Sequence, residues 1–177
     1  MSCPQTLVGI PKDCSPSMGG IDVVLIANRD DVASITITDG KISAITMQTS
    51  GTPPVTAEFK EYFFRPGTGS LNSEYQVDEA AGSQYVQSLL ALVFSRMETS
   101  KRVEISALAL ADSVAIVGDN NGKWWYLGYD HPLHLNAGTG ETGTARGDRN
   151  GYSITLQDDS KEMPMEVEAS VVAGLRA

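Results

Sequence analysis

The sequence predicts a mainly β protein: an antiparallel β-sandwich or open barrel with one flanking α-helix and extended terminal arms. Short runs rich in β-branched and aromatic residues recur along the chain, with turn residues between them. Two of these turns carry Asp-Gly or Asn-Gly, which are typical of tight hairpins. One segment alone has a clear helical composition and spacing, so the pattern does not fit a parallel α/β sheet.

The size and charge of the chain indicate a single domain and argue against nucleic acid and membranes as partners. A length of 177 residues fits one domain. The 13 Lys and Arg against 22 Asp and Glu give a formal net charge of −9, which opposes non-specific binding to nucleic acid or anionic lipid. The longest unbroken apolar run, Leu89 to Phe94, is far shorter than the roughly 18 residues that suggest a membrane span. We therefore expect no membrane partner and, without a secretory signal at the start, synthesis in the cytoplasm.

The first half of the chain is expected to form an arm followed by strands. Residues 1–20 are rich in Pro and Gly and have no sustained period, which predicts an extended N-terminal arm. Asp39-Gly40 predicts a type I′ hairpin turn, and Ile35 and Ile37 are expected to share a buried face of that hairpin. Residues Arg65 to Gly82 are expected to be an exposed loop or ribbon. Strands are expected at 21–27, 34–38, 41–47 and 57–64.

The second half is expected to hold the helix and a second hairpin. Residues 84–94 fit a strand or a helix by periodicity, and the strand is preferred. Thr99 or Ser100 can cap a helix that ends near Ala111. The second hairpin turns at Asn121-Gly122 between strands at 113–118 and 123–128, and the last strand is 152–157. Residues 21–157 are therefore the predicted sandwich domain, and residues 158–177 are either a C-terminal arm or an edge strand.

The sequence shows no convincing catalytic, cofactor or metal motif, so we expect no enzyme activity and no cofactor. Gly138 to Gly143 matches G-x-G-x-x-G, but the glycine-rich segment that follows disfavours the helix that a nucleotide site needs, and a flexible loop is expected. Ten residues separate Cys3 from Cys14, unlike the two to four typical of zinc sites, and both are expected to be free thiols. His131 and His134 are expected to lie in a solvated turn.

The densest aromatic group is the best candidate for an interface. Alternation along a strand places Trp124 and Tyr126 on one face and Trp125 on the other. We expect one face to enter the core and the other to bind a neighbouring subunit or stack on sugar rings. The remaining candidate interface residues are charged side chains of the predicted loops: Arg65, Arg146, Asp148 and Arg149. Residues 146–148 also spell the Arg-Gly-Asp adhesion tripeptide, which has little weight in so short a match.

Three segments together resemble a known family. They are the run EFKEYFFRPGT from Glu58, the run VAIV from Val114 followed by DNNGKWWYLG from Asp119, and the glycine-rich stretch from Gly138 to Tyr152. They resemble virion structural proteins of tailed phages that infect Bacteroides-type bacteria, and most of all tail tube proteins. The resemblance covers roughly residues 55–157, and the Pro-rich start with its two cysteines has no match in it.

The resemblance implies a β-sandwich flanked by one helix, in six copies that close into a ring. Rings stack into a tube in the virion tail, through which the genome passes without specific binding, and other tail or neck proteins are the remaining partners. Assembly takes place in the host cytoplasm. Arms and glycine-rich loops would link the rings, and an acidic lumen would repel DNA phosphates.

Two other functions stay open at this stage. One is a carbohydrate-binding β-sandwich that uses exposed Trp and Tyr side chains. The other is a nucleotide-dependent enzyme that uses the glycine-rich segment. Binding of a glycan or of a nucleotide would distinguish them from an assembly protein.

Overall fold

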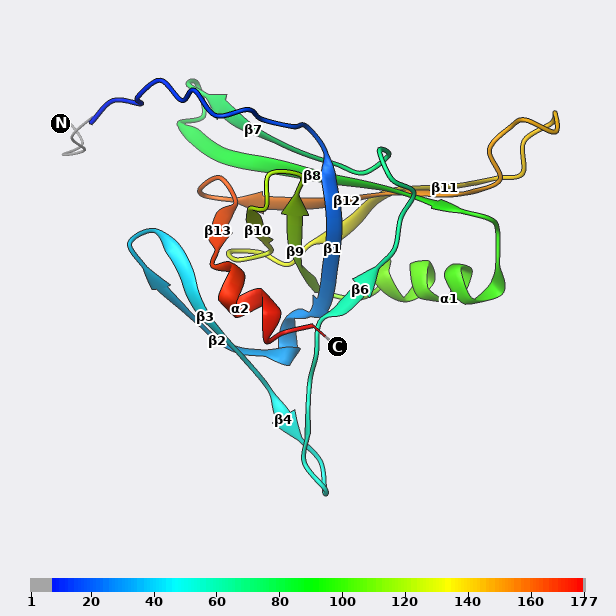
Figure 1. Ribbon diagram of the computed structural model, residues 1–177, viewed down its shortest axis with the longest axis horizontal. Coiled ribbons are helices and arrows are strands. Elements are labelled where there is room, and N and C mark those ends of the chain that lie inside the picture. The colour runs from blue at the N-terminus through cyan, green and yellow to red at the C-terminus, as the bar shows by residue number, and fades with distance from the viewer. Residues whose placement is uncertain (1–7, 177) are drawn as a thin grey trace.

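The computed structural model describes residues 8–176, which form two packed β-sheets, a small separate hairpin and two short α-helices (Figure 1). The predicted fold class, mainly antiparallel β with a flanking helix, is confirmed, and the sheets do not close into a barrel. Among the described residues, no helix has the length and apolar character needed to cross a membrane.

The larger sheet has seven strands in the order β2-β3-β13-β10-β9-β1-β6. Neighbouring strands are antiparallel except β13 and β3, which are parallel. The strands are β1 (Ile21–Asn28), β2 (Val32–Thr38), β3 (Lys41–Met47), β6 (Lys60–Tyr62), β9 (Ser113–Asp119), β10 (Trp124–Leu127) and β13 (Met165–Val167).

The smaller sheet has four antiparallel strands in the order β11-β12-β8-β7. They are β7 (Ser70–Asp78), β8 (Ser83–Ser95), β11 (His134–Glu141) and β12 (Gly151–Ser160). The other elements are a 3-10 turn (Arg29–Asp31), the short hairpin of β4 (Thr49–Ser50) and β5 (Val55–Thr56), and the helices α1 (Thr99–Leu108) and α2 (Ala169–Ala173).

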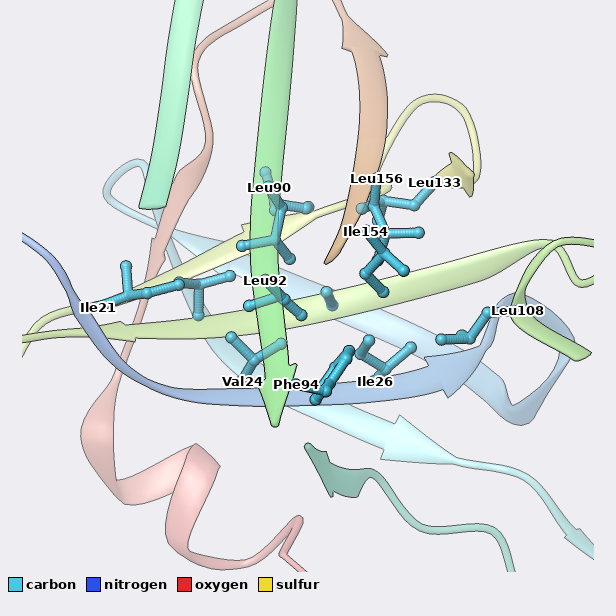
Figure 2. Close-up of a cluster of buried hydrophobic side chains, with 13 residues drawn as sticks. Ile21, Val24, Ile26, Leu90, Leu92, Phe94, Leu108, Leu133, Ile154 and Leu156 are labelled. Atoms are coloured by element: carbon cyan, nitrogen blue, oxygen red, sulfur yellow. The ribbon is translucent and has the colours of Figure 1, made fainter. Parts of the chain in front are cut away.

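The first hydrophobic core lies between the two sheets. Figure 2 shows Leu90, Leu92 and Phe94 of β8 alongside Val24 and Ile26 of β1. Strand β8 alternates buried and half-buried residues, as expected for a strand with one face in the core. Leu108 at the end of α1 is buried in this same cluster, so α1 closes one side of the sandwich.

The second core lies on the opposite face of the seven-stranded sheet. Val172 of α2 and Leu175 pack there against Ile42, Ile116 and Val167. Because both faces of this sheet are covered, its interior strand β9 is buried from Ser113 to Gly118. Buried strands of this kind read as continuous apolar runs rather than as alternation.

The predicted hairpins and the preferred strand at 84–94 are confirmed. Asp39 and Gly40 have positive φ values of 51° and 75°, as a type I′ turn requires, and Gly122 has φ 77° at the turn from β9 to β10. The predicted helix is confirmed as α1. The predicted cap is not, because Thr99 and Ser100 lie inside the first turn and the N-cap position is Glu98 with no side-chain cap hydrogen bond; the helix ends at Leu108 rather than near Ala111.

The structure corrects the paired burial of Ile35 and Ile37. The register between β2 and β3 shifts between Thr36 and Ile37. This irregularity breaks the alternation, so Ile35 is half-buried whereas Ile37 is 41% exposed.

Both predicted loops and the predicted strand at 57–64 are shorter in the structure. The segment from Arg65 to Gly82 contains strand β7, and β11 extends to Glu141, so the second loop covers only residues 142–150. These strands lie at sheet edges and have one face in solvent, which explains their polar composition. Strand β6 covers only Lys60–Tyr62.

The segment after residue 157 is neither an arm nor an edge strand. Strand β12 continues to Ser160, and β13 lies in the interior of the larger sheet between β10 and β3. Val167 pairs with Trp124 on one side and with Ile42 on the other, and is 1% exposed. The C-terminal residues therefore complete the second core.

Candidate functional site

The four-stranded sheet has two long open edges. Strands β11 and β7 each have one neighbour in the sheet. They run in opposite directions because three successive antiparallel pairings, through β12 and β8, connect them. Most of their residues are exposed. Natural edge strands are commonly protected by Lys or Pro, and neither residue occurs in β7 or β11. These edges are therefore suited to pairing with another strand.

The outer face of this sheet has no Lys or Arg; it is polar on β7, β11 and β12 and carries half-buried Leu89, Ala91 and Val93 on β8. Leu71, Leu90 and Ile154 point into the core, so the alternating positions face outward. None of the four strands contains a Lys or an Arg, although the chain has 13 of them. The outward positions include Asn72, Glu74, Gln76, Asp78, Gln87, Thr139, Ser153, Thr155, Gln157 and Asp159.

The carboxylates on this face give it a negative character. Glu74 and Asp78 lie on the outward positions of β7, and Asp159 lies on those of β12. The amide Nε2 of Gln157 donates to both oxygens of Asp159, at 3.0 and 3.1 Å, so the two side chains lie on the same face. The charged side chains at the outward positions of β7 and β12 are therefore all acidic.

The aromatic residues of β10 are buried or half-buried. Tyr126 is 2% exposed and belongs to the second core, and burial raises its pKa. Trp124 is half-buried against that core, with the Arg176 guanidinium 5.3 Å from its ring centre. Trp125 is half-buried, and its Nε1 donates to Asp119 Oδ2 at 3.1 Å. The predicted alternation is confirmed: Trp124 and Tyr126 face the second core, and Trp125 lies on the other face, where it is only partly exposed. An interface role for this group stays a prediction.

Two of the charged candidates in the 142–150 loop, Asp148 and Arg149, contact the loop itself or the adjoining end of β11. Asp148 Oδ2 accepts from the backbone N–H groups of Thr144 and Ala145 at 2.7 and 2.6 Å, which lowers the pKa of Asp148. Arg149 forms an ion pair with Glu141 at 3.0 Å. Arg146 is exposed at the tip. The Asp148 carboxylate is thus turned toward its own loop rather than presented beside Arg146.

The structure does not bring the two groups of predicted site residues together. Figure 1 shows the 142–150 loop projecting beyond one end of the sandwich, whereas β10 lies in the body of the molecule. Arg65 is exposed in the turn before β7, where its backbone carbonyl accepts from Thr68 Oγ1 at 2.5 Å.

A surface recess beside β10 is a feature that the sequence analysis missed. Its volume is about 220 Å³, and it lies between the β2–β3 hairpin and the segment after β12. Three exposed apolar side chains line it: Ile37, Tyr129 and Met163, which are 41%, 39% and 43% exposed. Such a recess suits an apolar side chain of a partner.

A buried carboxylate lies on the inner side of this recess. Asp158 is 2% exposed, and its Oδ1 accepts from Ser160 Oγ at 2.8 Å. Burial raises the pKa of Asp158, and the carboxylates of Asp159 and Asp130 raise it further, whereas hydrogen bonds from Ser160 and Gly128 oppose this. The alternation that places Ile154 and Leu156 inside also places Asp158 inside, so the signal was present in the sequence.

The candidate metal and nucleotide motifs are not assembled in the described residues. Among residues 8–176, no three His, Cys, Asp or Glu side chains are placed to hold a metal ion. His131, His134 and Cys14 are exposed, and Cys3 lies outside the described residues. The G-x-G-x-x-G segment begins within β11 and leads through the loop into β12, so no helix follows it.

Comparison with known proteins adds no assignment. The chain matches no protein-family model, and searches of curated proteins and of solved structures return no significant match.

Proposed function

We propose that this protein is a tail tube subunit of a tailed-phage virion. In this proposal, copies assembled in the host cytoplasm form hexameric rings that stack into a DNA-conducting tube and contact other tail or neck proteins. The observation that carries it is the four-stranded sheet, which combines two open edges with an outer face free of Lys and Arg. The hexameric number comes from the family resemblance.

The directions of the edge strands support ring closure. Because β7 and β11 run in opposite directions, β7 of one copy can pair antiparallel with β11 of the next. When the same contact is repeated by rotation about one axis, the sheet continues from copy to copy and its strand directions keep alternating. A head-to-tail contact of this kind gives a closed ring when the rotation closes. Closure would remove every open edge of this sheet.

The charge distribution supports a DNA-conducting lumen. If the continuous sheet lines the tube, its outer face carrying Glu74, Asp78 and Asp159 faces the genome. DNA phosphates bind proteins through Lys and Arg, and none is available on these strands. At physiological salt, charge repulsion reaches about 8 Å, which is enough to disfavour adsorption to the wall. The genome can then slide without specific binding.

The projecting segments support stacking of one ring on the next. The β4–β5 hairpin, the 142–150 loop and the N-terminal residues 8–17 extend from the sandwich in three different directions (Figure 1). None of them contributes a residue to either hydrophobic core. They are therefore free to contact further copies without disturbing the fold.

Electron microscopy of the purified protein tests the proposal directly. Rings or tubes are the expected result, and a strictly monomeric protein at high concentration would contradict it. Disulfide trapping then tests the edge contact. In a background with Cys3→Ser and Cys14→Ser, Asn72→Cys on β7 is combined in turn with Ala137→Cys, Thr139→Cys or Glu141→Cys on β11, because the register between copies is to be found. Adjacent strands bring facing Cβ atoms within about 5.5 Å, close to disulfide geometry.

The single-cysteine variants are the matched controls for this trapping experiment. A head-to-tail contact joins two different surfaces, so one of the double variants should give a ladder that ends at the closed ring. Each single variant can form at most a covalent dimer. Absence of a ladder in all three double variants would exclude the β7–β11 contact.

A further inference from the structure

The N-terminal arm, residues 8–17, is held at its base and has no contact for its apolar residues. At the base, the backbone N–H of Met18 donates to Asn121 Oδ1, and Asn121 Nδ2 donates to the Met18 carbonyl, both at 2.8 Å. Beyond this point every residue from 8 to 17 is exposed, with Val8 at 94% and Ile10 at 99%. The arm is therefore ordered at its base and presents apolar side chains to solvent.

The chemistry of the arm matches the recess beside β10. The recess has apolar walls formed by Ile37, Tyr129 and Met163. Its lining also includes the carboxylates Asp130, Asp158 and Glu162 and one cation, Lys161, so the carboxylates outnumber the cation. On the arm, Lys12 follows Ile10 by two residues. In an extended chain such residues lie on the same side, about 7 Å apart. If Ile10 occupies the recess, Lys12 can therefore lie near the carboxylates of Asp130 and Glu162.

The reach of the arm favours a neighbouring copy as the partner. Ten extended residues span at most about 36 Å, a length similar to the diameter of a small domain. Figure 1 shows the arm leaving β1 and running past the β7 hairpin, away from the body of its own chain. In the single chain the recess is open, and the arm that complements it is unpaired.

We propose that the recess receives Ile10 from the N-terminal arm of a second copy, with Lys12 of that arm facing Asp130 and Glu162. This inference rests on the self-assembly proposed above and names the arm contact between copies. The contact buries Ile10 and covers the exposed parts of Ile37 and Met163 at the same time. It also neutralises part of the negative charge beside the buried Asp158.

Disulfide trapping between two differently sized full-length chains tests this contact. Both chains carry Cys3→Ser and Cys14→Ser; one also carries Ile10→Cys, and the other carries Met163→Cys and a size tag. Mixing and oxidation should join the two chains. The control partner carries Ser106→Cys on the exposed face of α1 instead. Docking raises the local thiol concentration toward the millimolar range, so we expect at least about tenfold more product with Met163→Cys than with the control.

Charge reversal tests the role of Lys12 in the same assay. Lys12→Glu in the arm should lower the yield of joined chains, and Glu162→Lys in the recess partner should restore it. A salt titration should weaken the effect, as for any exposed ion pair. If neither substitution changes the yield of joined chains, the predicted placement of Lys12 is excluded.

The outcomes separate this proposal from the proposed function. A yield no greater than that of the Ser106→Cys control would overturn the arm contact. So would a bond formed only within a single chain that carries both Ile10→Cys and Met163→Cys. If the β7–β11 ladder still forms in either case, ring assembly survives and only the arm contact fails. If the protein is monomeric by microscopy and gives no ladder, the proposed function itself fails.

Discussion

Gly151 lies against the backbone of Phe94: a Cβ atom on Gly151 would be 2.0 Å from the Phe94 carbonyl oxygen. Gly151 begins β12 and pairs with Ser95 at the end of β8. The close approach brings the first residue of β12 onto β8 immediately after the 142–150 loop. Glycine is thus required at position 151 because a side chain would clash with the β8 backbone, and not because the residue has a left-handed backbone conformation.

Gly151→Ala should destabilise the protein. The added methyl group meets backbone atoms, which cannot rotate away, so we expect a loss of about 1–3 kcal/mol or more in the free energy of unfolding. For a domain of this size, each kcal/mol lowers the melting temperature by about 2–4 °C. Gly147→Ala in the neighbouring loop is the matched control, because nothing lies within 4 Å of a Cβ at that position. Equal melting temperatures for the two variants would contradict the close approach.

Glu166→Gln should cause a small, pH-dependent loss of stability. Glu166 on β13 forms ion pairs with Lys123, the residue before β10, at 2.7 Å and with Lys41, the first residue of β3, at 2.9 Å. Hydrogen bonds from Lys123 and Lys41 lower the pKa of Glu166 below 4.5. The stabilisation is therefore present above pH 4.5 and is lost as the pH falls through the lower value of the folded state.

The size of this effect is limited because the partners are exposed. Surface ion pairs contribute about 0–1 kcal/mol, so the variant should melt only a few degrees below the parent protein at pH 7. The difference should vanish in acid and shrink in high salt. A difference that grows as the pH falls would show that the ion pairs are not its cause.

Asp158→Asn should show the opposite pH dependence. Burial raises the pKa of Asp158 above 3.8, so folding favours the protonated carboxyl group. Its contribution to stability is fully present below pH 3.8 and is lost as the pH rises through the higher value of the folded state. The melting temperature of the parent protein relative to Asp158→Asn should therefore fall from acid toward neutral pH. Asp159→Asn, on the outer face of the same strand, is the control for a change in net charge.

The elements that the sequence predicted are those whose formation depends on residues close together in the chain. The Asp39-Gly40 turn, the hairpin at Gly122 and the helix from Thr99 follow from neighbouring residues alone. The long strand β8 was distinguished from a helix only by preference, because its apolar spacing fits both. These elements hold the sandwich together, which explains why the fold class was predicted.

The elements that the sequence did not predict depend on distant partners. Strand β13 has three residues, and its parallel pairing with Ile42 gives no local signal. The chain after β13 then places Val172 and Leu175 on the second face of the larger sheet, where they share a core with Tyr126; the covering of this face by distant residues also gives no local signal. Strand β7 is polar because its outer face meets solvent, and it therefore resembled a loop.

Asn121→Ala should release the base of the N-terminal arm with little effect on the fold. The substitution removes both hydrogen bonds between this side chain and Met18, while the turn keeps Gly122. A hydrogen bond of this kind contributes about 0.5–1.5 kcal/mol, so exchange of the Met18 amide hydrogen should accelerate by roughly 2- to 12-fold. Asn120→Ala is the matched control, because Asn120 Nδ2 donates to the carbonyl of Gly19 and not to Met18. Exchange followed by NMR at Met18 should thus respond to position 121 and not to position 120. An equal response to both substitutions would mean that the arm is held by the turn as a whole, and the specific role of Asn121 would have to be abandoned.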